Sequence, residues 1–284
     1  AIIFRNENVK SQDYAQFAAM PRPGHADLTA ALKWDDCQDP RGGGHFSGRI
    51  TAAIVAAGAI IISALKQKGI YIGTHISRCA EIEDISFTNY QADVEALNNK
   101  QFAVLDDNIG EEMQKRIIAA KNEGDSVGGV LETVVLGLPS GIGEPWFDTV
   151  EGMLSHALFS VPAIKGVEFG TGFALADMKG SVANDSFAIK NGEIVTETNN
   201  NGGINGGITN GMPVVFRCAV KPTPTILKSQ KTVDFLNMKE IEFKATGRHD
   251  PCIVHRARVV VDSITAIVLC DLLSTKYGTD WLVG

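Results

Sequence analysis

The sequence predicts an α+β domain in which long helices are buried between antiparallel sheets. The stretch 48–66 repeats apolar residues at i, i+3, i+4 and i+7, the spacing of a helix with an apolar face, and 257–276 is a second long apolar stretch that we expect to be helical. Between them lie short β-type runs separated by turns, and Asn191-Gly192 is the strongest local signal for a two-stranded hairpin. Because no linker or shift of composition divides the chain, we expect one domain over residues 1–284.

The elements follow from local patterns taken in order. Residues 1–5 read as a buried strand, and 11–39 as a mostly loop segment interrupted by prolines. The helix at 48–66 ends near Gly69, a residue suited to a left-handed helix terminus. The remaining elements are strands at 70–77, 127–138, 164–169, 187–190, 193–198 and 213–221, helices at 89–98, 111–122, 147–158 and 257–276, loops at 170–186 and 199–211, a mixed stretch at 232–243 and a polar turn at 247–252.

Composition excludes several classes of protein. A net charge of −7 argues against general affinity for nucleic acid or anionic membranes. The longest apolar stretch, 52–65, is shorter than the roughly 18 residues that span a membrane. The five cysteines are odd in number and form no CxxC pair, so we expect free thiols, a cytoplasmic location and no zinc cluster. No His, Cys, Asp and Glu set has the spacing of metal ligands, and we predict no metal.

A glycine-rich stretch precedes the first long helix. It runs from Arg41 through three glycines and His45 to Ser47, Gly48 and Arg49. The free N–H groups of a helix start, flanked by cations, form an anion site. The same stretch also fits an ordinary glycine-rich entry into a core helix, because it matches neither the Walker A nor the dinucleotide pattern. Local chemistry leaves these two interpretations open.

Two histidine segments are candidates for acid–base chemistry. His25 lies in the segment 22–27, Arg-Pro-Gly-His-Ala-Asp, between an arginine and an aspartate. His249 and Asp250 follow Arg248 in the polar turn before the last helix. Histidine exchanges protons near neutral pH, so both segments can carry catalysis. A surface loop for His25 and a helix cap for Asp250 are the alternatives.

Further phosphate-binding residues are spread over the chain. Lys221-Pro-Thr-Pro-Thr225 adds a cation and two hydroxyls directly after a predicted strand, and Asn205 lies in the preceding glycine-rich loop. Together with the arginines at 41, 49 and 248 they predict one composite site built from several loops. For His75, on a strand, and His156, on a helix, we expect packing roles.

These segments together resemble the chorismate synthase family, and they occur in the family's order along the whole chain. The matching segments are 11–14 (Ser-Gln-Asp-Tyr), 22–27, 41–49, 123–129 (Glu-Gly-Asp-Ser-Val-Gly-Gly), 161–168 (Val-Pro-Ala-Ile-Lys-Gly-Val-Glu), 184–185 (Asn-Asp), 202–211, 221–226 and 247–252 (Gly-Arg-His-Asp-Pro-Cys).

The resemblance implies both a fold and a reaction. The fold is a β-α-β sandwich in a homotetramer. The reaction is the 1,4-elimination of phosphate from 5-enolpyruvylshikimate 3-phosphate to give chorismate in the shikimate pathway, with reduced FMN as cofactor and no net redox change. No nicotinamide fingerprint is visible in the sequence, so we expect an external reductant.

The resemblance also assigns roles residue by residue. His25 matches the acid–base histidine, Asp250 the aspartate that handles the flavin N5 proton, and Ser47 a serine of the catalytic loop. The cofactor-binding matches are His25, Ser47, Gly48, Arg49, Asn205, Gly206, Lys221, Thr225, Arg248 and Asp250, and the substrate-binding matches are Arg41, Arg49 and Arg248.

The chain departs from the family pattern in two places. Phe46 stands where the family has a serine, and it cannot donate a hydroxyl hydrogen bond. The family's N-terminal segment, with a second catalytic histidine and several substrate-binding arginines, is absent from the chain. An alternative function is therefore a non-catalytic flavin- or phosphate-binding remnant.

Overall fold

A five-stranded antiparallel sheet forms the centre of the protein. The computed structural model describes residues 1–5, 19–35, 37, 41–246 and 250–282. The strand order is β2 (Ile82–Glu83), β1 (Tyr71–Cys79), β3 (Gly129–Leu136), β9 (Val214–Val220) and β4 (Ile164–Phe169). The other strands within the described ranges pair as three hairpins: β5–β6 (Phe187–Lys190 and Glu193–Thr196), β7–β8 (Ile204–Asn205 and Ile208–Thr209) and β10–β11 (Ser229–Asp234 and Lys239–Lys244).

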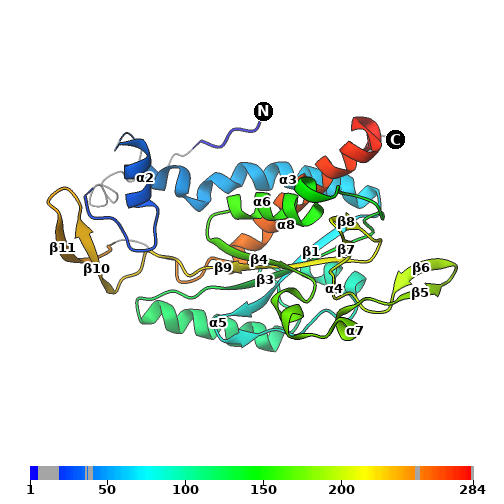
Figure 1. The fold of residues 1–284 in the computed structure, drawn as a ribbon. Helices are drawn as coiled ribbons and strands as arrows, with labels where there is room; N and C mark the ends of the chain where they lie inside the picture. Colours follow the sequence, from blue (N-terminus) through cyan, green and yellow to red (C-terminus); the bar gives the residue numbers. More distant parts are fainter. Residues whose placement is uncertain (6–18, 36, 38–40, 247–249, 283–284) are drawn as a thin grey trace.

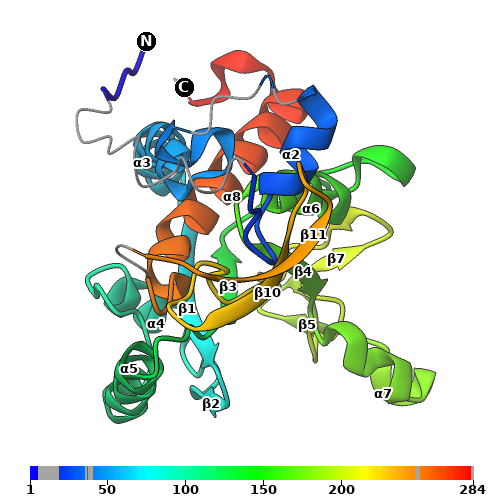
Figure 2. The same cartoon turned by 90° about the vertical axis from the view of Figure 1, so that its left-hand side faces the viewer.

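Helices lie on both sides of this sheet, which confirms the predicted α+β class (Figure 1). On one side are α3 (Thr51–Gln67), α6 (Val150–Ser160) and α8 (Val254–Tyr277), and on the other are α4 (Tyr90–Leu97), α5 (Asp107–Asn122) and α7 (Gly180–Ala183). Figure 2 shows α2 (Asp27–Trp34) and the β10–β11 hairpin together at one end of the molecule.

Strand alternation decides which side chains face the helix layer. In β9, Val214, Phe216, Cys218 and Val220 are buried, whereas the residues between them face the opposite side of the sheet. Successive side chains of a strand point to opposite faces, so one face becomes the apolar core. The other face is left free for polar groups.

The interfaces of α8 with its neighbours are close. A Cβ added to Gly58 of α3 would lie 2.2 Å from the Cβ of Ser263 in α8, so glycine permits this approach of the two helices. Toward the sheet, the hydroxyl of Thr74 donates to the buried Asp262, and Arg258 lies 3.4 Å from the same carboxylate. Burial raises the pKa of Asp262. A buried carboxylate is tolerated here because a cation and a hydroxyl face it.

The structure corrects two local predictions. Residues 1–5 form no strand and are exposed, with Ile3 81% accessible. An apolar run becomes a strand only where another strand pairs with it, and none does among the described residues. The predicted loop at 11–39 contains α2, which starts directly after the prolines and has Asp27 in its first turn. The mixed stretch at 232–243 falls within the β10–β11 hairpin.

The helix after the glycine-rich stretch is more exposed than predicted. The buried residues of α3 are Thr51, Gly58 and Leu65. The helical stretch Gly48–Gln67 is long and apolar enough to cross a membrane, although the uninterrupted apolar run is shorter. Length and composition alone are weak evidence, because core helices also meet these criteria.

Candidate active site

The turn before α2 is built around the buried side chain of Arg22. Its Nε and Nη2 donate to the two carboxylate oxygens of Asp27 at 2.8 and 2.7 Å, and its Nη1 donates to the hydroxyl of Thr225 at 3.1 Å. Burial by itself would raise the pKa of Asp27, but hydrogen bonds from Arg22 and His25 hold it well below its usual value of 3.8. Asp27 is therefore an anion at neutral pH.

His25 lies between an obligate donor and an obligate acceptor. Its Nδ1 is 3.0 Å from Nη2 of Arg22 and 2.7 Å from Oδ1 of Asp27. A guanidinium donates only and a carboxylate accepts only, so a lone pair on Nδ1 satisfies Arg22 and a proton on Nδ1 satisfies Asp27. The tautomer of His25 therefore decides which of the two partners its Nδ1 serves.

The loop after β9 contacts this turn. Arg22 and Thr225, which form one of the contacts, are 203 residues apart in the sequence. Nζ of Lys221 donates to the backbone oxygen of Gly24. Gly24 has φ +72, and a Cβ there would meet Pro224, so the two loops pack directly. The hydroxyl oxygen of Thr223 is buried and has no hydrogen-bond partner in the described part of the chain.

Asp250 lies on a turn connected to the same loop. The backbone N–H of Val127 donates to the oxygen of Pro251, and the hydroxyl of Ser126 donates to the oxygen of Thr223. Asp250 pairs with Arg256 at 2.7 Å and its carboxyl is 24% exposed. The predicted Arg248 lies outside the described residues.

The glycine-rich stretch forms two short 3₁₀ helices, Arg41–Phe46 and Gly48–Ile50, before α3 begins at Thr51. The hydroxyl of Ser47 accepts from the N–H of Arg49 at 3.3 Å, as a helix cap does. The ring of Phe46 lies 6.0 Å from that of Trp34, which connects the stretch to α2. The side chain of Arg41 lies outside the described residues.

The predicted composite site is only partly assembled within one chain. His25, Lys221 and Thr225 come together through Arg22 and Gly24. Asn205 and Gly206 instead lie in the β7–β8 hairpin, at the opposite end of the molecule from α2 and β10–β11 (Figure 1). Gly206 and Gly207 form the turn between β7 and β8, so the hairpin itself is set by local sequence. Its position relative to the central sheet is not specified by that local sequence.

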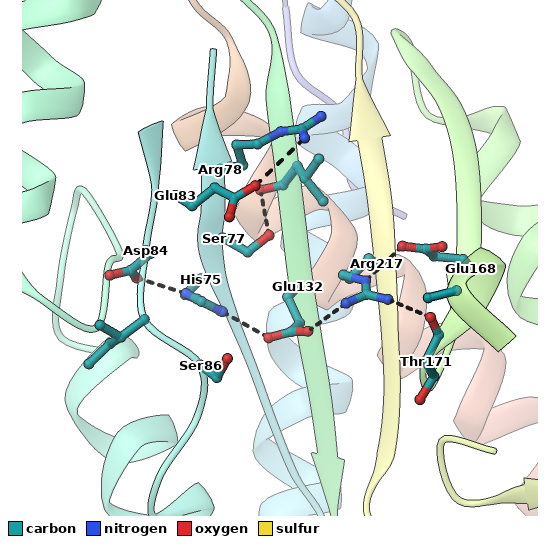
Figure 3. Close-up of a pocket in the computed structure, with 13 residues that line it drawn as sticks. His75, Ser77, Arg78, Glu83, Asp84, Ser86, Glu132, Glu168, Thr171 and Arg217 are labelled. Atoms are coloured by element: carbon teal, nitrogen blue, oxygen red, sulfur yellow. Dashed lines mark hydrogen bonds and ion pairs between the residues drawn. The ribbon is translucent and has the colours of Figure 1, made fainter. Parts of the chain in front are cut away.

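A second polar cluster lies on the face of the sheet that points away from α8. Cross-strand register aligns His75, Glu132, Arg217 and Glu168 on four neighbouring strands. In Figure 3, His75 bridges Asp84 and Glu132, and Arg217 lies between Glu132 and Glu168. These residues line a pocket of about 440 Å³.

This charged row revises the packing role predicted for His75. Burial would lower the pKa of the His75 imidazole, but hydrogen bonds with Asp84 and Glu132 outweigh it and raise that pKa above 6.5. Polar residues at alternate positions of otherwise apolar strands were the available signal in the sequence. Opposite charges in direct register stabilise the sheet, so the row needs no ligand to explain it.

The described residues hold no group of three or more His, Cys, Asp and Glu side chains able to bind a metal ion. The groups that do converge are a histidine, a lysine and a threonine hydroxyl beside a buried guanidinium. This chemistry suits an enzyme that moves protons on an anionic ligand.

Comparison with known proteins gives the family. The chorismate synthase family model matches residues 1–274. The chain is 45% identical to the chorismate synthase of Pyrococcus abyssi, over 96% of this chain and 76% of that protein. It is 43% identical to that of Thermococcus kodakarensis, over 100% of this chain and 78% of that protein. A solved crystal structure of a chorismate synthase superposes with a TM-score of 0.74 at 32% identity, covering 91% of this chain and 73% of that one.

The chain belongs to the chorismate synthase family. Its activity is that of a carbon–oxygen lyase that forms chorismate in the shikimate pathway.

Proposed function

We propose that the chain binds 5-enolpyruvylshikimate 3-phosphate and reduced FMN at the end of the molecule that carries α2 and the 221–225 loop, and eliminates phosphate there. The observation that carries the proposal is the contact of the His25 turn with Lys221 and Thr225, made through Arg22. Both ligands carry phosphate, and Lys and Arg bind phosphate through charge-assisted hydrogen bonds.

The residues present fit a phosphate-bearing cofactor. The buried hydroxyl of Thr223 has no partner among the described side chains and is a donor available to a bound group. Lys221 and Thr225 supply further donors in the same loop, and Arg49 adds a cation in the 3₁₀ helix that precedes α3. When bound, reduced flavin supplies electron density that helps phosphate leave the substrate.

The chain's own residues would handle the protons. A 1,4-elimination releases a proton and phosphate from the substrate. His25 can take up or release a proton at Nδ1, since Asp27 accepts from the protonated form and Arg22 donates to the neutral form. We assign Asp250 the proton at flavin N5. Lys221 and Arg49 offset the charge of the phosphate groups.

Asn205 and Gly206 lie too far along the molecule to share this site within one chain. In the homotetramer that we propose, a second copy would have to supply them. We also place the enzyme in the cytoplasm, where free cysteines stay reduced. Reduction of the flavin is assigned to an external reductant.

The test mixes the chain, reduced FMN and 5-enolpyruvylshikimate 3-phosphate without oxygen and follows chorismate by absorbance. We expect chorismate from wild type and loss of turnover in His25→Ala. Flavin binding without any product would instead support the non-catalytic remnant. The matched control is His156→Ala, which alters a histidine of α6 outside the proposed site.

A further inference from the structure

Two buried cysteines lie at the turn that carries Asp250. Cys79 ends β1 and Cys252 lies two residues before the start of α8, and their exposed fractions are 0% and 1%. We propose that hydrogen peroxide oxidises these two thiols to a disulfide within the chain, and that the disulfide reversibly lowers catalysis by displacing Asp250. The effect on catalysis rests on the proposed function, whereas formation of the disulfide does not.

The tertiary fold brings both cysteines to the first residue of β3. Cys79 is the register partner of Gly129 in the pairing of β1 with β3. On the helix side, a Cβ added to Gly129 would lie 3.2 Å from the side chain of Val254, which follows Cys252 by two residues. Both cysteines belong to the same buried apolar cluster, where the thiol of Cys79 donates a hydrogen bond to the sulfur of Cys252. Two sulfur atoms that share a hydrogen bond can form a disulfide after a small movement.

Cys252 has the surroundings of a nucleophilic thiolate. The hydrogen bond from Cys79 lowers the pKa of the Cys252 thiol, although burial opposes the shift. The imidazole of His255 and the backbone N–H of Val254, in the first turn of α8, also donate to the Cys252 sulfur. The hydrogen bond with Cys252 raises the pKa of Cys79, so the proton that the pair retains lies on Cys79. Because helix starts and nearby donors activate thiolates, Cys252 is the sulfur that attacks and Cys79 the thiol that completes the disulfide.

The ring of His255 adds a proton carrier to the pair. Its Nδ1 is buried and has no hydrogen-bond partner among the residues that the structure describes. The nitrogen that donates to the Cys252 sulfur is therefore Nε2, and Nδ1 carries a free lone pair. Native proteins rarely leave a buried polar atom unsatisfied, and redox chemistry is one of the reasons for the exceptions. The lone pair of Nδ1 can hold a proton for a group that leaves the sulfur.

The reaction balances with hydrogen peroxide as the oxidant. The Cys252 thiolate attacks one peroxide oxygen and the O–O bond breaks, and the leaving hydroxide takes a proton from the His255 imidazolium, which gives a sulfenic acid and water. The sulfur of Cys79 then displaces the hydroxyl group of the sulfenic acid, and the Cys79 proton leaves with it as a second water. Two thiols are oxidised and one peroxide is reduced. Reduced flavin yields hydrogen peroxide when it meets oxygen, so the proposed cofactor is a source of this oxidant.

The disulfide would act on the active site through the backbone of Cys252. The N–H of Cys252 donates to Oδ1 of Asp250 at 3.4 Å, and the same carboxylate pairs with Arg256 at 2.7 Å. A disulfide holds its sulfur atoms about 2.05 Å apart, much closer than two sulfur atoms in a hydrogen bond. The new bond therefore draws Cys252 toward β1 and changes the position of Asp250. A displacement of about 1 Å at a catalytic group can lower the rate about 100-fold.

The test treats the full chain with hydrogen peroxide, removes the peroxide and maps the cysteines by mass spectrometry after denaturation and alkylation. We expect a peptide with Cys79 to be joined to a peptide with Cys252, and dithiothreitol to separate the two. Chorismate formation should fall about 10-fold or more in the oxidised protein and recover after reduction. The internal control is Cys218 of β9, which is equally buried. Burial raises the pKa of the Cys218 thiol to about 12, so this thiol should stay free.

Two variants separate the roles of the thiols. In Cys79→Ser, peroxide should leave a sulfenic acid at Cys252 that dimedone traps, whereas in Cys252→Ser the buried Cys79 should stay unmodified. The proposal is overturned if Cys79 and Cys252 both remain free thiols after the exposed Cys37 has been oxidised, or if the oxidised protein forms chorismate as fast as the reduced one. A reduced wild type that forms no chorismate contradicts the proposed function instead, and the map of the cysteines still decides whether the thiol pair forms a disulfide.

Discussion

The coupling of Arg22 with Asp27 is the contact on which the proposed active site depends. Arg22→Met removes the two hydrogen bonds to the Asp27 carboxylate and the one to Thr225, while the backbone N–H of residue 22 still donates to Asp27 at 2.9 Å. The side chains of Arg22 and Asp27 are 8% and 13% exposed. The substitution therefore leaves a largely buried carboxylate with one strong donor fewer on each oxygen.

Removing one partner of a buried ion pair costs about 3–5 kcal/mol. We expect a value near 3 kcal/mol for Arg22→Met, the low end, because the backbone donor remains. Asp27→Asn removes the carboxylate charge that Arg22→Met would leave without its cation. The double variant should therefore lose less unfolding free energy than the sum of the two single losses, by about 2 kcal/mol.

The assay is urea unfolding of the four proteins, followed by far-ultraviolet circular dichroism. The control is the same cycle on Lys228 and Asp125, an ion pair of 2.7 Å whose side chains are 46% and 38% exposed. Exposed pairs couple only weakly, because water and salt screen their attraction. A coupling at Arg22 and Asp27 no larger than in this control would refute the role of the pair.

The same pair predicts a pH dependence. The pKa of Asp27 is lower in the folded than in the unfolded chain, so its contribution to stability is full above about pH 3.8 and is lost as the pH falls toward the folded value. Wild type should lose its advantage over Asp27→Asn over this acid range. An advantage that stays constant with pH contradicts the assignment.

Three further predictions concern other parts of the molecule. His25→Ala and Asp250→Ala should each lower chorismate formation by about 100-fold or more with unchanged circular dichroism, and near wild-type rates from both would reject the site. Because the pKa of His75 is raised in the folded chain, its contribution to stability is full below pH 6.5 and is lost as the pH rises through the folded value. The unfolding free energy of wild type should therefore approach that of His75→Asn at alkaline pH. A difference between the two proteins that does not change with pH contradicts the ion pairing. Gly58→Val should lower the unfolding free energy by about 2–3 kcal/mol, because the added side chain forces α3 away from α8. The control Ile60→Ser, at a position 66% exposed, should change the unfolding free energy by less than about 0.5 kcal/mol. Equal effects of the two substitutions would show that the close approach of the helices is not needed.

Local sequence patterns predicted most elements because their signals are local. Asn191-Gly192 placed the β5–β6 hairpin, and Gly69, with φ +76, ends α3 as predicted. Strand pairing is not a local property, because a strand depends on a neighbour that is often distant in sequence. Residues 1–5 have the composition of a strand and find no partner in the described part of the chain.

Which side chains share a site depended on the tertiary fold. The sequence by itself determined the family and the chemistry, because the histidine, lysine, arginine and threonine motifs are contiguous and occur in a fixed order. The tertiary structure brought Arg22 to Thr225, placed Asn205 at the far end, and aligned His75 with Glu132. Contacts between such distant residues are set by strand order, register and helix packing, which no local window of sequence contains.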